Sequence, residues 1–332
     1  PWQAGTLEWA GEVPDQPWGV RSVPIISSRY PIWDQPNFID DIDKGRFYLP
    51  DAEEGKRETI VTTVLDAEPV QCLRVPGPSF VPMIAAGFLG ASFIAATFHW
   101  WWWMFGTLFL AVAAIIHWLW RATSVIPEKE EKDVGLGLSL PIYVSGPHSV
   151  SWWAMFITML GDMTAFLSLV FGYFFYFTIH ERFPGPELAG PGVVWPGVSL
   201  ALFLMAFGAA ILSHLRLRAG AVSTARVLLA AGIVLVLAAA AALLYGPYVT
   251  GMAPRAHVYP AIVWLLAIWT ALHGAVGALM LGFCLAGTLT GRLTPRYDID
   301  LANVRLYFHF LAATALITVA TLVLVPLAGG AA

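Results

Sequence analysis

Charged residues are scarce in this chain. Lysine, arginine, aspartate and glutamate make up 12% of the 332 residues, whereas hydrophobic residues make up 58%. Because a soluble protein needs more charge to cover its surface, this composition is typical of a protein that crosses a membrane several times. The chain also lacks the blocks of Lys and Arg interleaved with aromatic residues that bind nucleic acid, so we expect no nucleic acid partner.

Motifs that hold metals or carry catalysis are also missing. The two cysteines, Cys72 and Cys284, lie in a polar segment and in an apolar run, so we expect no disulfide. No His-His, His-x-x-x-Tyr or Cys-x-x-x-Cys spacing occurs, no Gly-rich phosphate loop is present, and no strand is predicted. We therefore assign no metal and no catalytic residue. Six histidines mark the ends of apolar segments, where interfacial hydrogen bonding is usual: His99, His117, His148, His180, His214 and His257.

Residues 1–77 contain no run long enough to span a membrane. They are rich in proline, which forbids a long helix, and residues 37–77 have the charged composition of a solvated linker. Since the chain opens on Pro1 rather than Met, we expect the polypeptide to continue upstream. The aromatic residues of this region have two alternative roles, anchoring near lipid headgroups or docking on a partner. They are Trp2, Trp9, Trp18, Tyr30 and Trp33.

Seven apolar segments follow, which predicts an all-α integral membrane protein. We place them at 79–98, 102–120, 149–179, 195–215, 225–244, 258–285 and 306–327. The short corner between the first two makes residues 78–121 an antiparallel hairpin. A charged loop at 122–147 separates this hairpin from a five-helix bundle at 148–332.

Positive charges fall mainly on alternate loops. If the first 78 residues are cytoplasmic, the inner loops carry nine Lys or Arg residues and the outer loops carry two. This asymmetry satisfies the positive-inside rule and predicts that the chain begins in the cytoplasm and ends outside it. The nine are Arg121, Lys129, Lys132, Arg216, Arg218, Arg226, Arg292, Arg296 and Arg305, and the two are Arg182 and Arg255.

The segment 149–179 holds one carboxylate, Asp162, inside an otherwise apolar run. As a helix its 31 residues would measure roughly 46 Å, more than the roughly 30 Å of a bilayer core, and Asp162 would lie roughly 20 Å from its start. An ionisable group at that depth is a candidate functional residue. The alternative is a neutral carboxylic acid that is hydrogen-bonded to Thr164 or to a neighbouring helix.

Two other features are candidates for packing or lipid contact. The sixth segment has a face of small residues suited to close helix packing, and a substrate route is the weaker alternative: Ala271, Gly274, Ala275, Gly277, Ala278 and Gly282. Arg121, together with Trp118 and Trp120, ends the second segment, where it could meet a lipid phosphate or serve only as a positive-inside anchor.

Several stretches resemble the haem-copper cytochrome oxidase family, in the order expected for a subunit I tail fused to subunit III. PWQAGTLEWA and SRYPIWDQP resemble the tail of subunit I, with the match carried by Pro1, Trp2, Thr6, Leu7, Glu8 and Trp9. The resemblance to subunit III is carried by GPSFVPMIAAGF, HWLWRA, MFITMLGDMTAFLSLVFGYFFYF, PGPELAGPGVVWP, LHGAVGALML and LYFHF. These last stretches contain Asp162, His273, Gly274 and His309.

The resemblance implies seven helices in a 2 + 5 arrangement around a V-shaped cleft that binds phospholipid. It implies a module without redox centres that stabilises a proton-pumping terminal oxidase, with haems and copper in the partner subunits I and II. The electron donor would be cytochrome c, or quinol in the other branch of the family. The implied location is the bacterial inner membrane.

The chain departs from the family pattern at two points. The family commonly has Glu where Asp162 stands, and the acidic residue after the His-Phe pair is replaced by Leu311 and Ala312. Outside the family, a small transporter and a pure assembly scaffold are the alternatives. The sequence has no evident inverted repeat, which disfavours a transporter.

Overall fold

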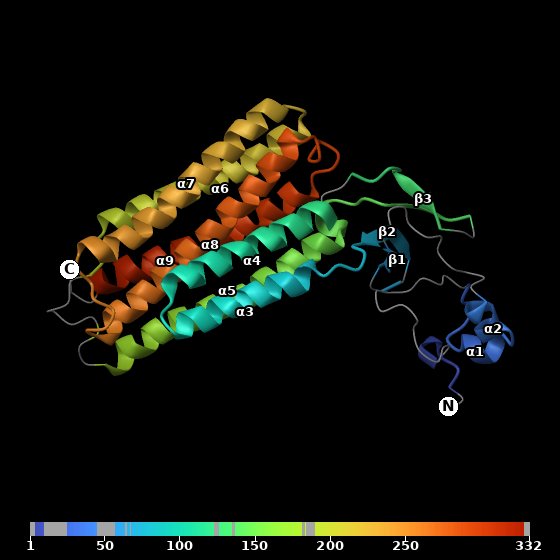
Figure 1. Ribbon diagram of the computed structural model, residues 1–332, viewed down its shortest axis with the longest axis horizontal. Helices are drawn as coiled ribbons and strands as arrows, with labels where there is room; N and C mark the ends of the chain where they lie inside the picture. The colour runs from blue at the N-terminus through green and yellow to red at the C-terminus, as the bar shows by residue number, and fades with distance from the viewer. Residues whose placement is uncertain are drawn as a thin grey trace. The chain divides into compact units, whose positions relative to one another are not determined.

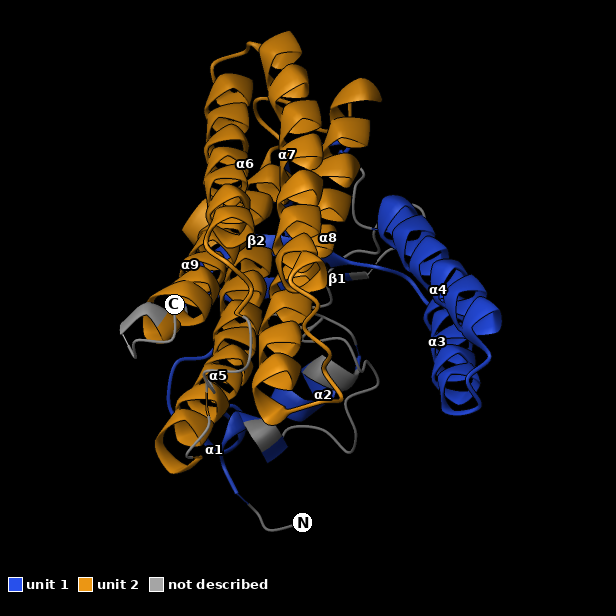
Figure 2. Ribbon diagram, turned by 90° about the vertical axis from the view of Figure 1, so that its left-hand side faces the viewer, with its two compact units in different colours: residues 1–144 blue, residues 145–332 orange. Residues whose placement is uncertain are grey.

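A computed structural model describes residues 4–9, 25–44, 57–63, 65–66, 68–122, 126–134, 137–180, 183 and 190–328. The chain divides into two compact units, residues 1–144 and 145–332 (Figure 2). Parts of the segments that carry the family resemblance lie outside the described residues: Pro1 and Trp2 of the tail, and 184–189 of the loop after the third segment. Trp18 and Arg182 lie outside them as well.

Within the described residues, six helices are long and apolar enough to cross a membrane, so the chain is a largely helical, multi-pass membrane protein (Figure 1). They are α4 (Trp101–Ala122), α5 (Val150–Ile179), α6 (Val194–Arg218), α7 (Val222–Val249), α8 (Val258–Leu289) and α9 (Ile299–Ala328). The first predicted segment forms α3 (Val81–Thr97), whose 17 residues measure about 26 Å, somewhat less than the hydrocarbon thickness.

Tight corners make neighbouring helices antiparallel. At the end of α3, His99 adopts a left-handed conformation with φ of 60°, and Trp100 N–H donates to Ala95 O at 2.9 Å. At the end of α6, Gly220 has φ of 78° and Ala221 N–H donates to Arg216 O at 2.9 Å. Both corners are Schellman motifs, in which the last helical carbonyls gain donors and the chain reverses at once.

The second unit contains α5 to α9 and buries about half of the most apolar stretch of α8. Gly274 faces the Phe203 ring of α6, which would stand 3.2 Å from an added Cβ, and Gly277 faces Phe308 of α9 at 3.3 Å. These two glycines therefore let helices approach closely, as the small-residue face predicts. Gly282 was placed on the same face, but an added Cβ there would meet nothing within 4 Å.

The first unit begins with short helical pieces and not with a long helix. A 3₁₀ turn (Leu7–Trp9), α1 (Pro31–Asp34) and α2 (Phe38–Asp43) lie in this region. The Trp33 ring packs directly against Gly5, and Ile32 N–H donates to Gly5 O at 3.2 Å. The tail therefore folds back on itself around Trp33.

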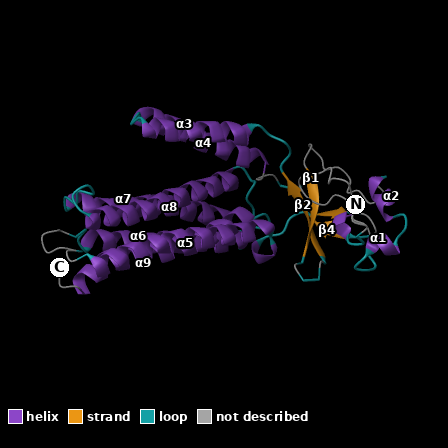
Figure 3. Ribbon diagram, turned by 90° about the horizontal axis from the view of Figure 1, so that it is seen from below, coloured by secondary structure: helices purple, strands orange, loops and turns teal. Residues whose placement is uncertain are grey.

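Four short strands correct the prediction that the chain has none (Figure 3). β1 (Arg57–Thr62) pairs with β2 (Pro69–Val75), and β3 (Glu131–Asp133) pairs with β4 (Ser139–Pro141), both antiparallel. Gln71 Nε2 donates to Ile142 O at 3.0 Å and joins the two hairpins, which we call the β module. The predicted linker and charged loop thus form one packed structure, and residues 59–62 (Thr-Ile-Val-Thr) form a run of four β-branched residues, which favours a strand.

A buried carboxylate holds the β module together. The Glu58 side chain is fully buried, accepts from Arg74 Nε at 2.9 Å and pairs with Lys132 from the other hairpin. Arg74 also pairs with Glu128. Burial, followed by the negative charge of Glu58, raises the pKa of the adjacent Cys72 thiol to about 11. Cys72 is therefore protonated and enclosed, with Val134 and Leu140 packed around it.

We expect Glu58→Gln to open the β module, because Arg74 and Lys132 lose the carboxylate that compensates their partial burial. Breaking a buried pair costs about 3 kcal/mol, or roughly 100-fold in the open fraction. The rate at which a maleimide alkylates Cys72 measures this opening, and the lower thiol pKa in the variant acts in the same direction.

Two controls accompany this measurement. Cys284 of α8 is also buried, and its alkylation rate should not change. Glu128→Gln removes the more exposed partner of Arg74 and should change the Cys72 rate only a few-fold. Equal Cys72 rates in the wild type and in Glu58→Gln would show that the ion cluster does not hold the module.

Candidate functional site

The structure brings Asp162 of α5 close to His273 of α8. Asp162 Oδ2 lies 3.7 Å from His273 Nε2, within the range of an ion pair but longer than a direct hydrogen bond. The His273 side chain is largely buried, whereas 39% of the Asp162 side chain is exposed on the surface of the second unit. Thr164 is not its partner, since the Thr164 hydroxyl donates to Leu160 O within its own helix at 2.9 Å.

The other ring nitrogen of His273 determines what the pair can do. His273 Nδ1 lies 2.9 Å from Trp269 O, and because a carbonyl only accepts, Nδ1 must carry a proton. In a neutral ring Nε2 is then an acceptor, and so is an ionised Asp162. The two groups are compatible when one proton lies between them, either on the carboxyl group or on the imidazole, so that the pair has no net charge.

Aromatic and polar groups from α8 and α9 surround His273. The Tyr307 hydroxyl donates to His273 O at 2.7 Å, and the Trp269 and Phe310 rings have centroids 4.7 and 5.5 Å from the imidazole. Trp269 and Phe310 thus pack against the imidazole while its Nε2 faces Asp162, and Tyr307 binds the backbone carbonyl of His273. This arrangement places a carboxyl group and an imidazole that can share one proton at an apolar surface.

His309 and Gly274, the other two residues matched by the resemblance, do not join this pair. The His309 imidazole packs edge-on against Phe207 of α6 with ring centroids 4.8 Å apart, and it is exposed. Its Nδ1 lies 2.7 Å from Arg305 O. Gly274 contacts Phe203 and serves packing. The candidate site therefore consists of Asp162 and His273, with Trp269 and Phe310 positioning the imidazole.

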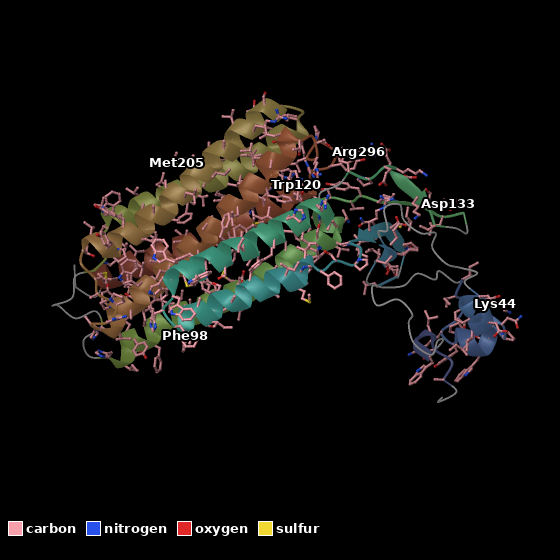
Figure 4. The ribbon with its side chains drawn as sticks, in the orientation of Figure 1. Lys44, Phe98, Trp120, Asp133, Met205 and Arg296 are labelled. Atoms are coloured by element: carbon pink, nitrogen blue, oxygen red, sulfur yellow. The ribbon has the colours of Figure 1, made fainter. Side chains whose placement is uncertain are left out.

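The proposed headgroup residues lie at the end of α4. Arg121 is exposed in the last turn, and Trp118 and Trp120 are half-buried. Figure 4 shows Trp120 at one end of the α3–α4 hairpin and Phe98 at the other. The Trp118 indole N–H is buried with no hydrogen-bond partner among the described residues.

A second charged cluster, around Asp298, was not predicted from the sequence. Asp298, which precedes α9, is buried, and Ser145 Oγ donates to its Oδ1 at 2.6 Å. Its other oxygen, Oδ2, meets His214 Nε2 at 2.8 Å and Arg218 Nε at 2.5 Å. His214 and Arg218 are four residues apart on α6 and so share one helix face, which is the signal that would have pointed to an acidic partner.

Hydrogen bonding keeps Asp298 ionised. Burial alone raises the pKa of this carboxyl group, but hydrogen bonds from His214, Arg218 and Ser145 outweigh burial and hold the pKa well below its usual range. The carboxylate therefore fastens the chain before α5, the end of α6 and the start of α9 to one another.

Comparisons with known proteins do not assign this chain to a family. No protein family model matches this chain, and no curated protein is significantly similar to it. Within the part of the chain that the structure describes, no three His, Cys, Asp or Glu side chains gather as metal ligands would.

We expect Asp298→Asn to lower the unfolding free energy by about 2 kcal/mol at pH 7, because His214 and Arg218 lose their anion, although solvent reaches Arg218. Since the folded-state pKa of Asp298 is depressed, its contribution is complete above the unfolded-state value of about 3.9 and is lost as pH falls toward the folded-state value.

The difference in unfolding free energy between the wild type and Asp298→Asn should therefore be constant from pH 7 to pH 5 and should be smaller by about 1 kcal/mol at pH 3. Thermal unfolding in detergent at these pH values measures it. The exposed Asp133 of β3 supplies the control, and Asp133→Asn should change stability by less than about 0.5 kcal/mol. A difference that grows on acidification would contradict this account.

Proposed function

We propose that this chain is the third-subunit portion of a haem-copper terminal oxidase, which reduces oxygen to water and pumps protons. The chain would stabilise the catalytic subunit and bind phospholipid without redox centres of its own. One observation supports this most: Asp162 and His273, which the resemblance selects from separate segments, face each other across α5 and α8 at 3.7 Å. Partner subunits I and II would carry the haems and copper and receive electrons from cytochrome c, or from quinol in the other branch.

The Asp162–His273 pair gives this module a proton-holding group on its surface. Asp162 and His273 together carry no net charge when one proton is shared between the carboxylate and Nε2. Because 39% of the Asp162 side chain is exposed, a lipid or a partner subunit that packs on α5 can reach the carboxyl group. We propose that the pair helps to hold phospholipid in the cleft, or that it helps to supply protons to the uptake surface of the catalytic subunit. Ordinary functional roles for intramembrane carboxylates are of this kind.

We further propose that α3 also crosses the membrane, which gives seven spans in a 2 + 5 order. The β1–β2 hairpin precedes α3 and the β3–β4 hairpin follows α4, yet Gln71 bonds Ile142 and Glu58 pairs with Lys132. Both hairpins must therefore lie on one side of the bilayer. An even number of crossings separates them, so if α4 crosses then α3 crosses too. Positive charge in the predicted inner loops favours the cytoplasmic side for the β module.

The function is tested by purifying the native complex through a tag on this chain and recording its reduced-minus-oxidised absorbance spectrum. An a-type haem signal is expected for a cytochrome c oxidase, and b- and o-type signals alone would indicate the quinol branch. An intact complex without haem would refute the oxidase proposal.

We expect Asp162→Asn to leave the haem spectrum unchanged and to shorten the active lifetime of the oxidase several-fold during turnover. Asparagine cannot share a proton with His273, so the pair loses its function while the packing volume is kept. The control is Thr158→Val, one turn away on the same face of α5, whose hydroxyl donates to Ala154 O in its own helix at 2.9 Å. An unchanged turnover rate and lifetime in Asp162→Asn would remove the proposed role.

Cysteine labelling in oriented vesicles tests the crossing of α3. Leu65 in the β1–β2 turn and Trp102 at the α3–α4 corner are both 91% exposed, whereas both native cysteines are buried. We expect a membrane-impermeant maleimide to label Leu65→Cys from the cytoplasmic side and Trp102→Cys from the opposite side. Labelling of both from one side would mean that α3 and α4 do not cross.

A further inference from the structure

A groove on the surface of the second unit lies between α7 and α8. Its accessible lining is almost entirely apolar and is formed by Ala241, Leu244, Tyr245, Tyr248 and Trp264. The first four residues belong to the end of α7, and Trp264 lies near the start of α8. Since α7 ends where α8 begins, on one side of the bilayer, the groove lies at a single membrane–water boundary.

The apolar segments 225–244 and 258–285 give the depth of this groove. Ala241 and Leu244 lie in the last turn of the first segment, and Tyr245 and Tyr248 follow it. Trp264 lies six residues, about 9 Å, inside the second segment. The Ala241 end of the groove is therefore in hydrocarbon, and the tyrosines lie at the level of the headgroups, where Tyr and Trp are enriched.

Contacts with neighbouring residues hold the aromatic walls of the groove in place. Trp264 Nε1 donates to Met252 O in the α7–α8 loop at 2.8 Å. The Tyr245 ring packs edge-on against Trp195 of α6 with centroids 4.7 Å apart. Tyr248 is 71% exposed, and its ring centroid lies 6.1 Å from that of Tyr245. The shape of the groove is thus set by the protein before a ligand binds.

The size of the groove favours a lipid chain over a helix. The groove encloses about 250 Å³. A single turn of α-helix, 5.4 Å long and about 10 Å across, occupies roughly 400 Å³. The groove therefore cannot seat a helix of another protein, but it has room for several methylene groups of one acyl chain.

The charge beside the groove favours a lipid with a negative headgroup. Residues 245–257 contain one arginine, Arg255, and no Asp, Glu or Lys, and Arg255 is exposed. Three residues span at most about 10 Å, and Arg255 follows Met252, which contacts Trp264, by three residues. A turn in which Ala256 N–H donates to Ala253 O at 3.1 Å shortens this distance further.

We propose that this groove binds one phospholipid of net negative charge. An acyl chain lies along Ala241 and Leu244, the hydroxyls of Tyr245 and Tyr248 lie beside the ester groups, and the phosphate pairs with Arg255. Arginine binds phosphate through strong charge-assisted hydrogen bonds. The proposal rests on α7 and α8 crossing the membrane and not on the oxidase function.

Photolabelling with a lipid tests the groove. The intact complex that contains this chain is purified through a tag and placed in phosphatidylcholine nanodiscs with a small fraction of phosphatidylglycerol that carries a diazirine in one acyl chain. Mass spectrometry should find the label on peptides that contain residues 241–248 or Trp264. Unlabelled phosphatidylglycerol should compete with the label, whereas phosphatidylcholine and inorganic phosphate should not.

Variants separate the apolar part of the site from the charged part. Ala241→Phe fills the hydrocarbon end, and because it excludes about two methylene groups it should lower labelling about tenfold. Arg255→Gln should reduce the preference for phosphatidylglycerol over phosphatidylcholine about fivefold, and Arg255→Lys should keep most of it. The control is Val234→Phe, two turns before Ala241 on the same face of α7 and 68% exposed, which should change nothing. Thermal unfolding of each variant identifies loss of fold.

Three results would overturn this proposal. They are equal labelling along the whole exposed face of α7, including the peptide around Val234, labelling that Arg255→Gln leaves unchanged, and no label at the groove in the intact complex. The outcome is independent of the haem spectrum. Selective labelling in a complex without haem would support the groove and refute the oxidase function, and a haem-containing complex without label at the groove would do the reverse.

Discussion

The hydrocarbon core offers no hydrogen-bond partners, and many polar side chains of the second unit bond to neighbouring helices or to their own helix instead. Thr270 of α8 bonds Thr318 of α9 at 2.8 Å, and Ser199 of α6 bonds Ala239 O of α7 at 2.8 Å. His273 and His309 each direct Nδ1 to the carbonyl four residues earlier, so each imidazole presents Nε2 alone to its neighbours. The Nε2 of His273 faces Asp162, whereas His309 is exposed at the surface of the second unit.

The same arrangement recurs where the chain leaves the apolar spans. Glu58 and Asp298 are both buried carboxylates, and each meets basic side chains from segments that are distant in sequence. Burying a carboxylate is unfavourable unless its partners are in place, so each cluster stabilises one arrangement of its segments and disfavours others. In these polar regions the ion pairs of Glu58 and Asp298 hold segments together, a role that apolar packing has in the core.

Hydrophobic runs were sufficient to predict the helices, because a span needs little beyond length and low charge. Asp162 could be singled out for the same reason, as the one carboxylate inside such a run. Its pairing with His273 could not be predicted, since it depends on how α5 and α8 rotate against each other. The β module was missed because β3 and β4 have only three residues each, and because its two hairpins are separated by α3 and α4. Asp298 was missed because nothing in its local sequence reveals His214 beside it.

The order of the chain gives the β module a place in biogenesis. Glu58 and Arg74 are synthesised before α3 and α4, but Lys132, Leu140 and the acceptor at Ile142 emerge only after both helices. The early hairpin therefore pairs Glu58 with Arg74 alone until the later hairpin supplies Lys132. Because Lys132 and Ile142 follow α4 in the chain, the β module can close only after α3 and α4 have both been synthesised.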